Sequence, residues 1–149
     1  MPQGIARLEP FVFYGCKRLA QVTLPQGLTG IDRYAFEGCA ALSHLDFPAG
    51  LTAIEDSAFA GSGLTRADLP DGLETIGEGA FQLSRLQHVS LPESVKKIGA
   101  DAFSDIPLKR VDNAAALMLA GCKISLEPGG AAFWSPKKLE DAPAGWPAW

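Results

Sequence analysis

Two histidines are the side chains that most readily suggest metal or acid–base chemistry. His44 and His88 occupy the same place in two similar segments, LSHLDFP and LQHVSLP. A zinc site needs several donor atoms about 2 Å from one centre, and Arg66 holds the same place in a third segment, LTRADLP, between them. The spacing therefore argues against a metal site. We expect instead that the surrounding surface responds weakly to pH, because free histidine titrates at about pH 6.5, just below neutral.

Serine, glycine and acidic side chains give little support for catalysis. No serine stands in a G-x-S-x-G setting, and the glycines of IGEGAF are not followed by the Lys-Ser/Thr of a phosphate-binding loop. Four acidic residues fall in expected turns, where a solvated carboxylate is ordinary: Glu55, Asp56, Glu78 and Asp101. We therefore expect no catalytic residue, no cofactor and no turnover.

The composition narrows the class of protein further. Among 149 residues, thirteen are basic and seventeen acidic, and 13 − 17 gives a net charge of −4. The basic residues form no run, which argues against a nucleic-acid partner. No apolar run approaches the roughly 20 residues of a membrane span. The opening MPQGIARLEP has no charged start followed by an apolar stretch, so we expect no signal peptide here, and the chain can equally be a fragment of a longer protein.

The chain repeats every 22 or 23 residues. Five phenylalanines follow one another at steps of 23, 23, 22 and 22: Phe13, Phe36, Phe59, Phe81 and Phe103. From each of them to the next leucine the step is six residues in FYGCKRL and FEGCAAL, but five in FAGSGL, FQLSRL and FSDIPL. The other steps within the unit are constant, so one corner alone accepts an extra residue.

Each unit reads L-x-x-V-x-L-P-x-x-L-x-x-I-x-x-x-A-F. The V-x-L segment alternates apolar and polar residues and predicts a short strand in every unit, which the following proline ends. Its inward pairs are Val22/Leu24, Leu45/Phe47, Ala67/Leu69 and Val89/Leu91. LTGI, LTAI, LETI and VKKI predict a second short strand, and DRYAF, EDSAF and GEGAF predict a tight turn or a single helical turn.

A unit of this size cannot bury its apolar residues alone, but it can do so when stacked on its neighbours, as in a solenoid. Each coil then advances by one strand spacing, about 4.8 Å. The fold class predicted over residues 1–112 is a right-handed, β-rich solenoid of about five coils of 22 or 23 residues. The five phenylalanines form its structural core.

The units LSHLDFPAGLTAIEDSAFAGS and LQHVSLPESVKKIGADAFSDI resemble the BspA-type leucine-rich repeat, and the resemblance runs from about Leu8 to Asp112. It implies a non-enzymatic adhesion or protein-interaction module of the kind found in bacterial surface and secreted proteins and in some protozoan surface proteins. It also implies an extracellular or cell-surface location. The cysteine of the family unit is held by Cys16 and Cys39, and later units replace it with Ser62, Ser84 and Ile106.

Three cysteines are too few for a disulfide framework, and an odd number cannot all be paired within the chain. Cys16 and Cys39 occupy equivalent corners of adjacent coils, and a separation of about one strand spacing would fit a disulfide. A small side chain packs inward at that corner, however, so free thiols are expected. Cys122 is expected in the core of a cap.

Beyond Asp112 the repeat breaks. We predict a C-terminal cap at 113–134, where NAAALMLAG signals a short helix and CKISLEPGGAAFW a strand, a turn and a second strand. The Pro-rich residues 135–149 predict a loosely packed tail, whose tryptophans pack on the cap or contact a neighbouring module. At the other end the chain enters a unit directly at Leu8, which indicates excision from a longer array or a partner covering that end.

Strand residues that point away from the core form two polar columns. The first is basic or titratable: Gln21, His44, Arg66, His88 and Arg110. The second is acidic or hydroxyl-bearing: Thr23, Asp46, Asp68, Ser90 and Asp112. The columns form either a recognition face or a salt-bridged, solvated surface that keeps the array soluble, since exposed ion pairs contribute little individually.

The function predicted from these columns is the rigid display of a polar face to a protein or glycan partner, centred on Arg66 between Asp46 and Asp68. The alternative is a structural spacer or stalk in a longer surface protein, in which the face is inert and the ends are joints. An enzyme would need a pocket that a thin solenoid seldom offers. We expect neither a nucleic-acid partner nor membrane insertion.

Overall fold

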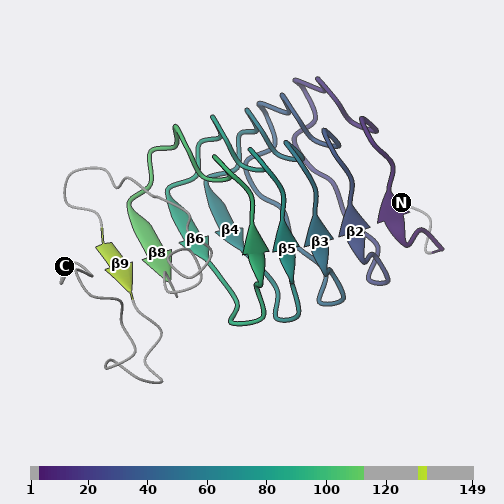
Figure 1. Ribbon diagram of the computed structural model, residues 1–149. Helices are drawn as coiled ribbons and strands as arrows, with labels where there is room; N and C mark the ends of the chain where they lie inside the picture. Colours follow the sequence, from purple (N-terminus) through teal and green to yellow (C-terminus); the bar gives the residue numbers. More distant parts are fainter. Residues whose placement is uncertain (1–3, 113–130, 134–149) are drawn as a thin grey trace.

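The structure is a computed structural model, and it describes residues 4–112 and 131–133. In this part of the chain, short parallel strands stack coil upon coil into a β-solenoid (Figure 1). One sheet has the strand order β1-β2-β3-β5-β7 and comprises β1 Arg7–Leu8, β2 Gly30–Ile31, β3 Ala53–Ile54, β5 Thr75–Ile76 and β7 Lys97–Ile98. The other has the order β4-β6-β8-β9 and comprises β4 Arg66–Asp68, β6 His88–Ser90, β8 Arg110–Asp112 and β9 Ala131–Phe133.

Neighbouring strands pair one repeat unit apart. The isoleucine of each unit lies opposite that of the next, in the series Ile31, Ile54, Ile76 and Ile98. Because the register equals the repeat, equivalent side chains stack on one another, and the apolar set that recurs in the sequence becomes one continuous core. The predicted solenoid of stacked coils is thereby confirmed.

The repeat phenylalanines form the spine of that core. Successive ring centroids lie 5.3, 5.1, 5.4 and 5.4 Å apart from Phe13 to Phe103. The rings of Phe36, Phe59 and Phe81 are fully buried, whereas Phe13 is half-buried. The predicted stacking is confirmed, and the inner rings have the most packing to lose.

The segments before and around each spine phenylalanine are turns rather than helical turns. Alternate amides donate to the next coil, as in Tyr34 N to Asp56 O at 3.1 Å and Phe36 N to Ala58 O at 2.7 Å. The amides between them close turns within the coil, as in Cys39 N to Phe36 O at 3.2 Å. This alternation uses the backbone donors without any helix.

Two positions in every coil adopt a left-handed backbone. The first series has φ between 53° and 63°: Phe11, Tyr34, Ser57, Gly79 and Asp101. The second has φ between 56° and 76°: Gly15, Gly38, Gly61, Leu83 and Asp105. Glycine adopts this backbone without strain, whereas other residues do so at a cost.

The prediction of a V-x-L strand in every unit is wrong for the first two units. Residues 21–24 and 44–47 form no regular strand, whereas β4, β6 and β8 occupy the equivalent segments of later units. The three strands follow five-residue corners, and the two irregular segments follow six-residue corners. We attribute the difference to the extra corner residue, which displaces the segment so that its amides do not align with those of the next coil.

The prediction of buried free thiols at the cysteine corner holds in part, because Cys16 is only half-buried. Cys16 and Cys39 are free thiols, Cys39 is buried, and its Sγ donates to Phe13 O at 3.2 Å. Burial, followed by the nearby Cys16, raises the pKa of Cys39 to about 11 despite a hydrogen bond that lowers it. A thiol with so high a pKa is unreactive near neutral pH.

Most of the predicted cap, with its helix and Cys122, and the tail at 135–149 lie outside the described residues. Within residues 113–134 the structure describes β9, which pairs in parallel with β8 and continues the second sheet by one strand. The boundaries of cap and tail stay predictions.

Candidate interaction face

The second sheet places six of the ten predicted face residues on three consecutive strands. Pairing sets Arg66 opposite His88 and His88 opposite Arg110, and it aligns Asp68, Ser90 and Asp112 in the same way. The residues between them, such as Val89, are buried. Period-two alternation therefore turns both columns outward on this sheet.

Each arginine of the face is held by the carboxylate two residues later on its own strand. Arg66 Nε donates to Asp68 Oδ2 at 2.7 Å, and Arg110 Nε donates to Asp112 Oδ1 at 3.0 Å. The hydrogen bond to Asp68 raises the pKa of Arg66 above its usual value. Because the contact uses Nε, it orients the guanidinium group of each arginine.

His88 departs from this pattern because Ser90 stands where a carboxylate would follow. Its Nε2 lies 2.8 Å from Asp112 Oδ2 on the neighbouring strand, so Asp112 serves both His88 and Arg110. Partial burial raises the pKa of Asp112, but the hydrogen bonds and charges of these two partners outweigh it and bring the pKa below its ordinary value of 3.8. This contact ties two coils together across the face.

The first two coils carry the other four predicted face residues outside regular strands. His44 Nε2 lies 3.0 Å from Asp46 Oδ1, and both side chains are more than 70% exposed. Gln21 and Thr23 are exposed as well. The two columns therefore continue as exposed side chains, without the hydrogen-bonded ladder that fixes them in later coils.

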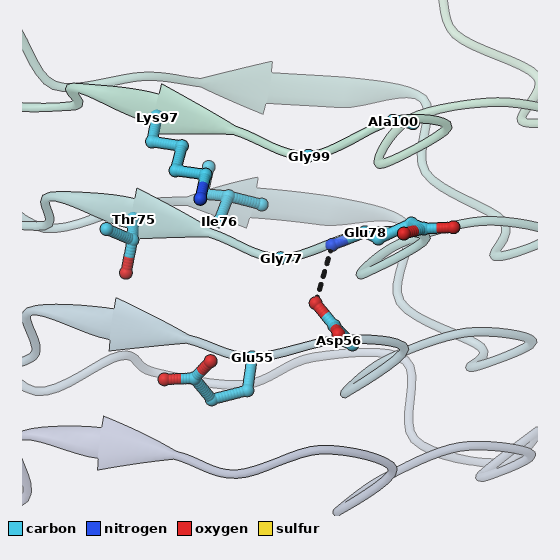
Figure 2. A pocket seen from close by; sticks show the side chains of 9 residues that line it. All are labelled: Glu55, Asp56, Thr75, Ile76, Gly77, Glu78, Lys97, Gly99 and Ala100. Atoms are coloured by element: carbon cyan, nitrogen blue, oxygen red, sulfur yellow. Dashed lines mark hydrogen bonds between the residues drawn. The ribbon is translucent and has the colours of Figure 1, made fainter.

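Three features of the described residues bear on other functions. Residues 4–112 and 131–133 contain no group of three His, Cys, Asp or Glu side chains placed to hold a metal ion. The same residues include no helix long and apolar enough to cross a membrane. Beside the first sheet, at the loops that follow its strands, lies an open hollow of about 580 Å³ (Figure 2).

The hollow is lined mainly by glycines and charged residues. Figure 2 shows Glu55 on one side and Lys97 on the other, with Gly77 and Gly99 on the backbones of two successive coils. A Cβ at Gly77 would collide with Asp56, and one at Gly99 would collide with Glu78. Close packing of the coils therefore accounts for the glycines.

The four acidic turn residues are partly as predicted. Asp56, Glu78 and Asp101 are exposed. Glu55 is half-buried instead, and its Oε1 accepts from Arg7 Nη2 at 3.3 Å across two coil steps. Asp56 Oδ1 also accepts from the backbone N–H of Glu78 at 2.8 Å, which joins two successive coils.

An exposed aromatic cluster on the turns was missed by sequence reasoning. Phe11 stacks on Tyr34, with ring centroids 4.8 Å apart, and Tyr14 meets the edge of Phe11 at 5.4 Å. The signal was available, because these rings stand where later units carry small or polar residues.

Comparison with known proteins identifies the repeat. A family model for the BspA-type leucine-rich repeat region matches residues 1–117, with six copies. A crystal structure of a T. pallidum leucine-rich repeat protein superposes with a TM-score of 0.72 at 28% identity, covering 90% of this chain and 71% of that one. No curated protein matches.

A second solved structure shares the fold. A leucine-rich repeat protein from Bacteroides ovatus superposes with a TM-score of 0.55 at 21% identity. The match covers 75% of this chain but 42% of the Bacteroides protein, so this chain spans less than half of that relative. Given the family match, the stacked coils and the in-register columns, the chain belongs to the BspA-type leucine-rich repeat family.

Proposed function

We propose that this chain is a non-enzymatic interaction and adhesion module of a bacterial cell surface, and that it binds a protein or glycan partner through the face formed by Arg66, Asp68, His88, Arg110 and Asp112. Repeats of this family generally serve as interaction or structural modules. Curved repeat arrays generally bind through an extended strand surface. The location outside the cell rests on the same resemblance.

The observation that carries the proposal is the alignment of cations and anions on three strands in fixed register. Arg66 and Arg110 lie two strands apart, about 10 Å from backbone to backbone. Their Nε contacts hold both guanidinium groups in place beforehand. Prior ordering lowers the entropy lost on binding, which favours recognition through several shallow contacts.

One observation favours the alternative function of a spacer or stalk. The face charges satisfy one another, as in Arg66 with Asp68 and His88 with Asp112. A surface of mutually paired, solvated charges can serve solubility alone. In that case the face would contact no partner, and the chain would act through its length and rigidity.

A charge-swap experiment separates the two functions. The variant Arg66→Asp/Asp68→Arg keeps an ion pair on β4 but exchanges the columns, so folding should be preserved while recognition changes. The wild type and this variant are tested on a glycan array and on an array of purified secreted proteins. We expect the wild type to bind a defined ligand and the swap to weaken that binding about tenfold or more.

The matched control is a swap of an exposed pair on the other side of the coil, Lys96→Glu/Glu74→Lys, whose Nζ and Oε1 lie 3.3 Å apart. This swap should leave binding unchanged. The interaction proposal fails, and the spacer function gains support, if the wild type binds nothing on either array. It fails equally if both swaps weaken binding to the same degree.

A further inference from the structure

Exposed apolar side chains are concentrated on the turns rather than on either sheet. Across the described range, the large hydrophobic residues that are exposed are Phe11 at 48%, Val12 at 43%, Tyr14 at 54% and Leu83 at 64%. The first three lie together in the first coil, and Tyr34 of the next coil stacks on Phe11 with an interplanar angle of 16°. We call Phe11, Val12, Tyr14 and Tyr34 the aromatic cluster.

Folding alone does not account for the aromatic cluster. Phe11 and Tyr34 both hold a left-handed backbone, with φ of 62° and 59°. At the same position, later coils carry Ser57, Gly79 and Asp101, which are smaller. The left-handed conformation costs both bulky residues stability, and stacking of the two rings offsets only part of that cost.

The chain around the cluster is more basic than the rest of the protein. Residues 4–40 carry four basic residues, Arg7, Lys17, Arg18 and Arg33, and three acidic ones, Glu9, Asp32 and Glu37, so 4 − 3 gives +1. The whole chain carries −4, which leaves −5 elsewhere.

Three of these cations are available to a partner. Arg7 is engaged by Asp32 and Glu55. Within residues 4–112, no ion pair engages Lys17, Arg18 or Arg33. Arg33 directly precedes Tyr34, and its carbonyl accepts from Phe11 N at 3.1 Å, so it adjoins the cluster. An anionic partner would therefore meet the positive charge of Arg33 beside the aromatic rings, with Lys17 and Arg18 following Tyr14 in the sequence.

We propose that the aromatic cluster is a docking surface for an acidic peptide segment of a partner protein that carries a large apolar side chain. That side chain would pack against Phe11 and Tyr14, while the acidic groups pair with Lys17, Arg18 and Arg33. Tyrosine, phenylalanine and arginine are enriched where proteins bind one another. The cluster lies on turns and not on the strand face, so this inference stands apart from the proposed function.

The test uses the full chain and three labelled ten-residue peptides in fluorescence anisotropy. One peptide is Asp/Glu-rich with two tryptophans, the second has serine in place of tryptophan, and the third keeps the tryptophans but is Lys-rich. We expect measurable binding of the first peptide alone, weakened by added salt. Tyr14→Ser and Arg33→Glu should each weaken it about tenfold.

Leu83→Ser is the matched control, since Leu83 is exposed on a turn of a later coil, outside the aromatic cluster. It should leave peptide binding unchanged. Val12→Ser serves as a second cluster variant should Tyr14→Ser fail to fold. The proposal is overturned if the acidic tryptophan peptide does not bind at about 1 mM, or if Leu83→Ser weakens binding as much as the cluster variants.

Two other occupants are tested in parallel. Co-sedimentation with vesicles of anionic lipid, lost in Tyr14→Ser, would assign the cluster to a membrane surface and contradict a peptide partner. Self-association in analytical ultracentrifugation, likewise lost in Tyr14→Ser, would assign it to a second copy of the chain and contradict the proposal too.

Discussion

The rings of Phe36 and Phe59 lie 5.1 Å apart and 6° from parallel. They stand 23 residues apart in the sequence, so one complete coil separates them along the chain and one strand spacing separates them in space. Both rings are fully buried. The same stacking of rings, repeated from Phe13 to Phe103, fixes the position of the second sheet and of the turns that carry the aromatic cluster.

Removing an inner ring of this spine should destabilise the protein strongly. Phe59→Ala leaves a cavity between two neighbouring rings, and we expect the free energy of unfolding to fall by about 3–5 kcal/mol. Phe13→Ala should lower it less, because Phe13 is half-buried and has one spine neighbour. Urea denaturation of both variants measures the difference, and an equal loss would show that the rings do not pack as described.

Replacing Leu83 by glycine should stabilise the protein, in contrast to the loss of a spine ring. It has φ of 61° at a position where three earlier coils use glycine, and its side chain is 64% exposed. Leu83→Gly removes the left-handed strain and should raise the free energy of unfolding by roughly 1 kcal/mol. Leu83→Ala keeps the strain and should change little. Thermal unfolding ranks the two, and a loss of stability in the glycine variant would contradict this explanation.

Replacing Ser62 or Ser84 by alanine should change the free energy of unfolding in opposite directions. Both are buried at equivalent corners of their coils, but Ser84 Oγ donates to Phe81 O at 2.7 Å, whereas Ser62 Oγ has no hydrogen-bond partner among the described residues. Ser62→Ala removes an unsatisfied buried hydroxyl and should stabilise the protein by about 1 kcal/mol. Ser84→Ala should destabilise it by a similar amount. Changes of the same sign in urea denaturation would refute the assignment.

Asp112 should make stability depend on acid pH. Its native pKa lies below 3.8, so its contribution is complete above that value and is lost as the pH falls through the native pKa. Asp112→Asn should therefore be less stable than the wild type near neutral pH, and the gap should close towards pH 2.

The matched control for Asp112 is Asp46→Asn, whose carboxylate is 93% exposed and paired only with His44 in the described structure. This change should shift stability little at any pH, because exposed pairs contribute little. The free energy of unfolding, measured by urea at several pH values, supplies the comparison. A gap between wild type and Asp112→Asn that stays constant with pH would rule out the linkage.

Much of the fold is predictable from spacing. Steps of 23 and 22 residues between Phe36, Phe59 and Phe81 indicate that equivalent residues stack, and alternation along each V-x-L segment places Arg66 and Asp68 outward. These inferences need only the repeat length and the two-residue period of a strand. They do not reveal which V-x-L segments form hydrogen-bonded strands, because that depends on how the amides align after corners of different length.

The partners of individual side chains were harder to predict. Ser90 leaves His88 without a carboxylate on its own strand, and only the structure shows that Asp112 of the next coil replaces it. The left-handed positions are signalled by glycine in three coils but hidden by Leu83 in a fourth. The aromatic cluster escaped notice because Phe11 and Tyr14 flank a spine residue and look like additional core.

Nuclear Overhauser contacts between phenylalanine ring protons test the stacked-coil arrangement most directly. With selectively labelled phenylalanine assigned by single substitutions, the account predicts contacts between Phe36 and Phe59 and between Phe59 and Phe81, and none between Phe36 and Phe81. Absence of the first two contacts in the folded protein, or a strong contact between Phe36 and Phe81, would contradict it.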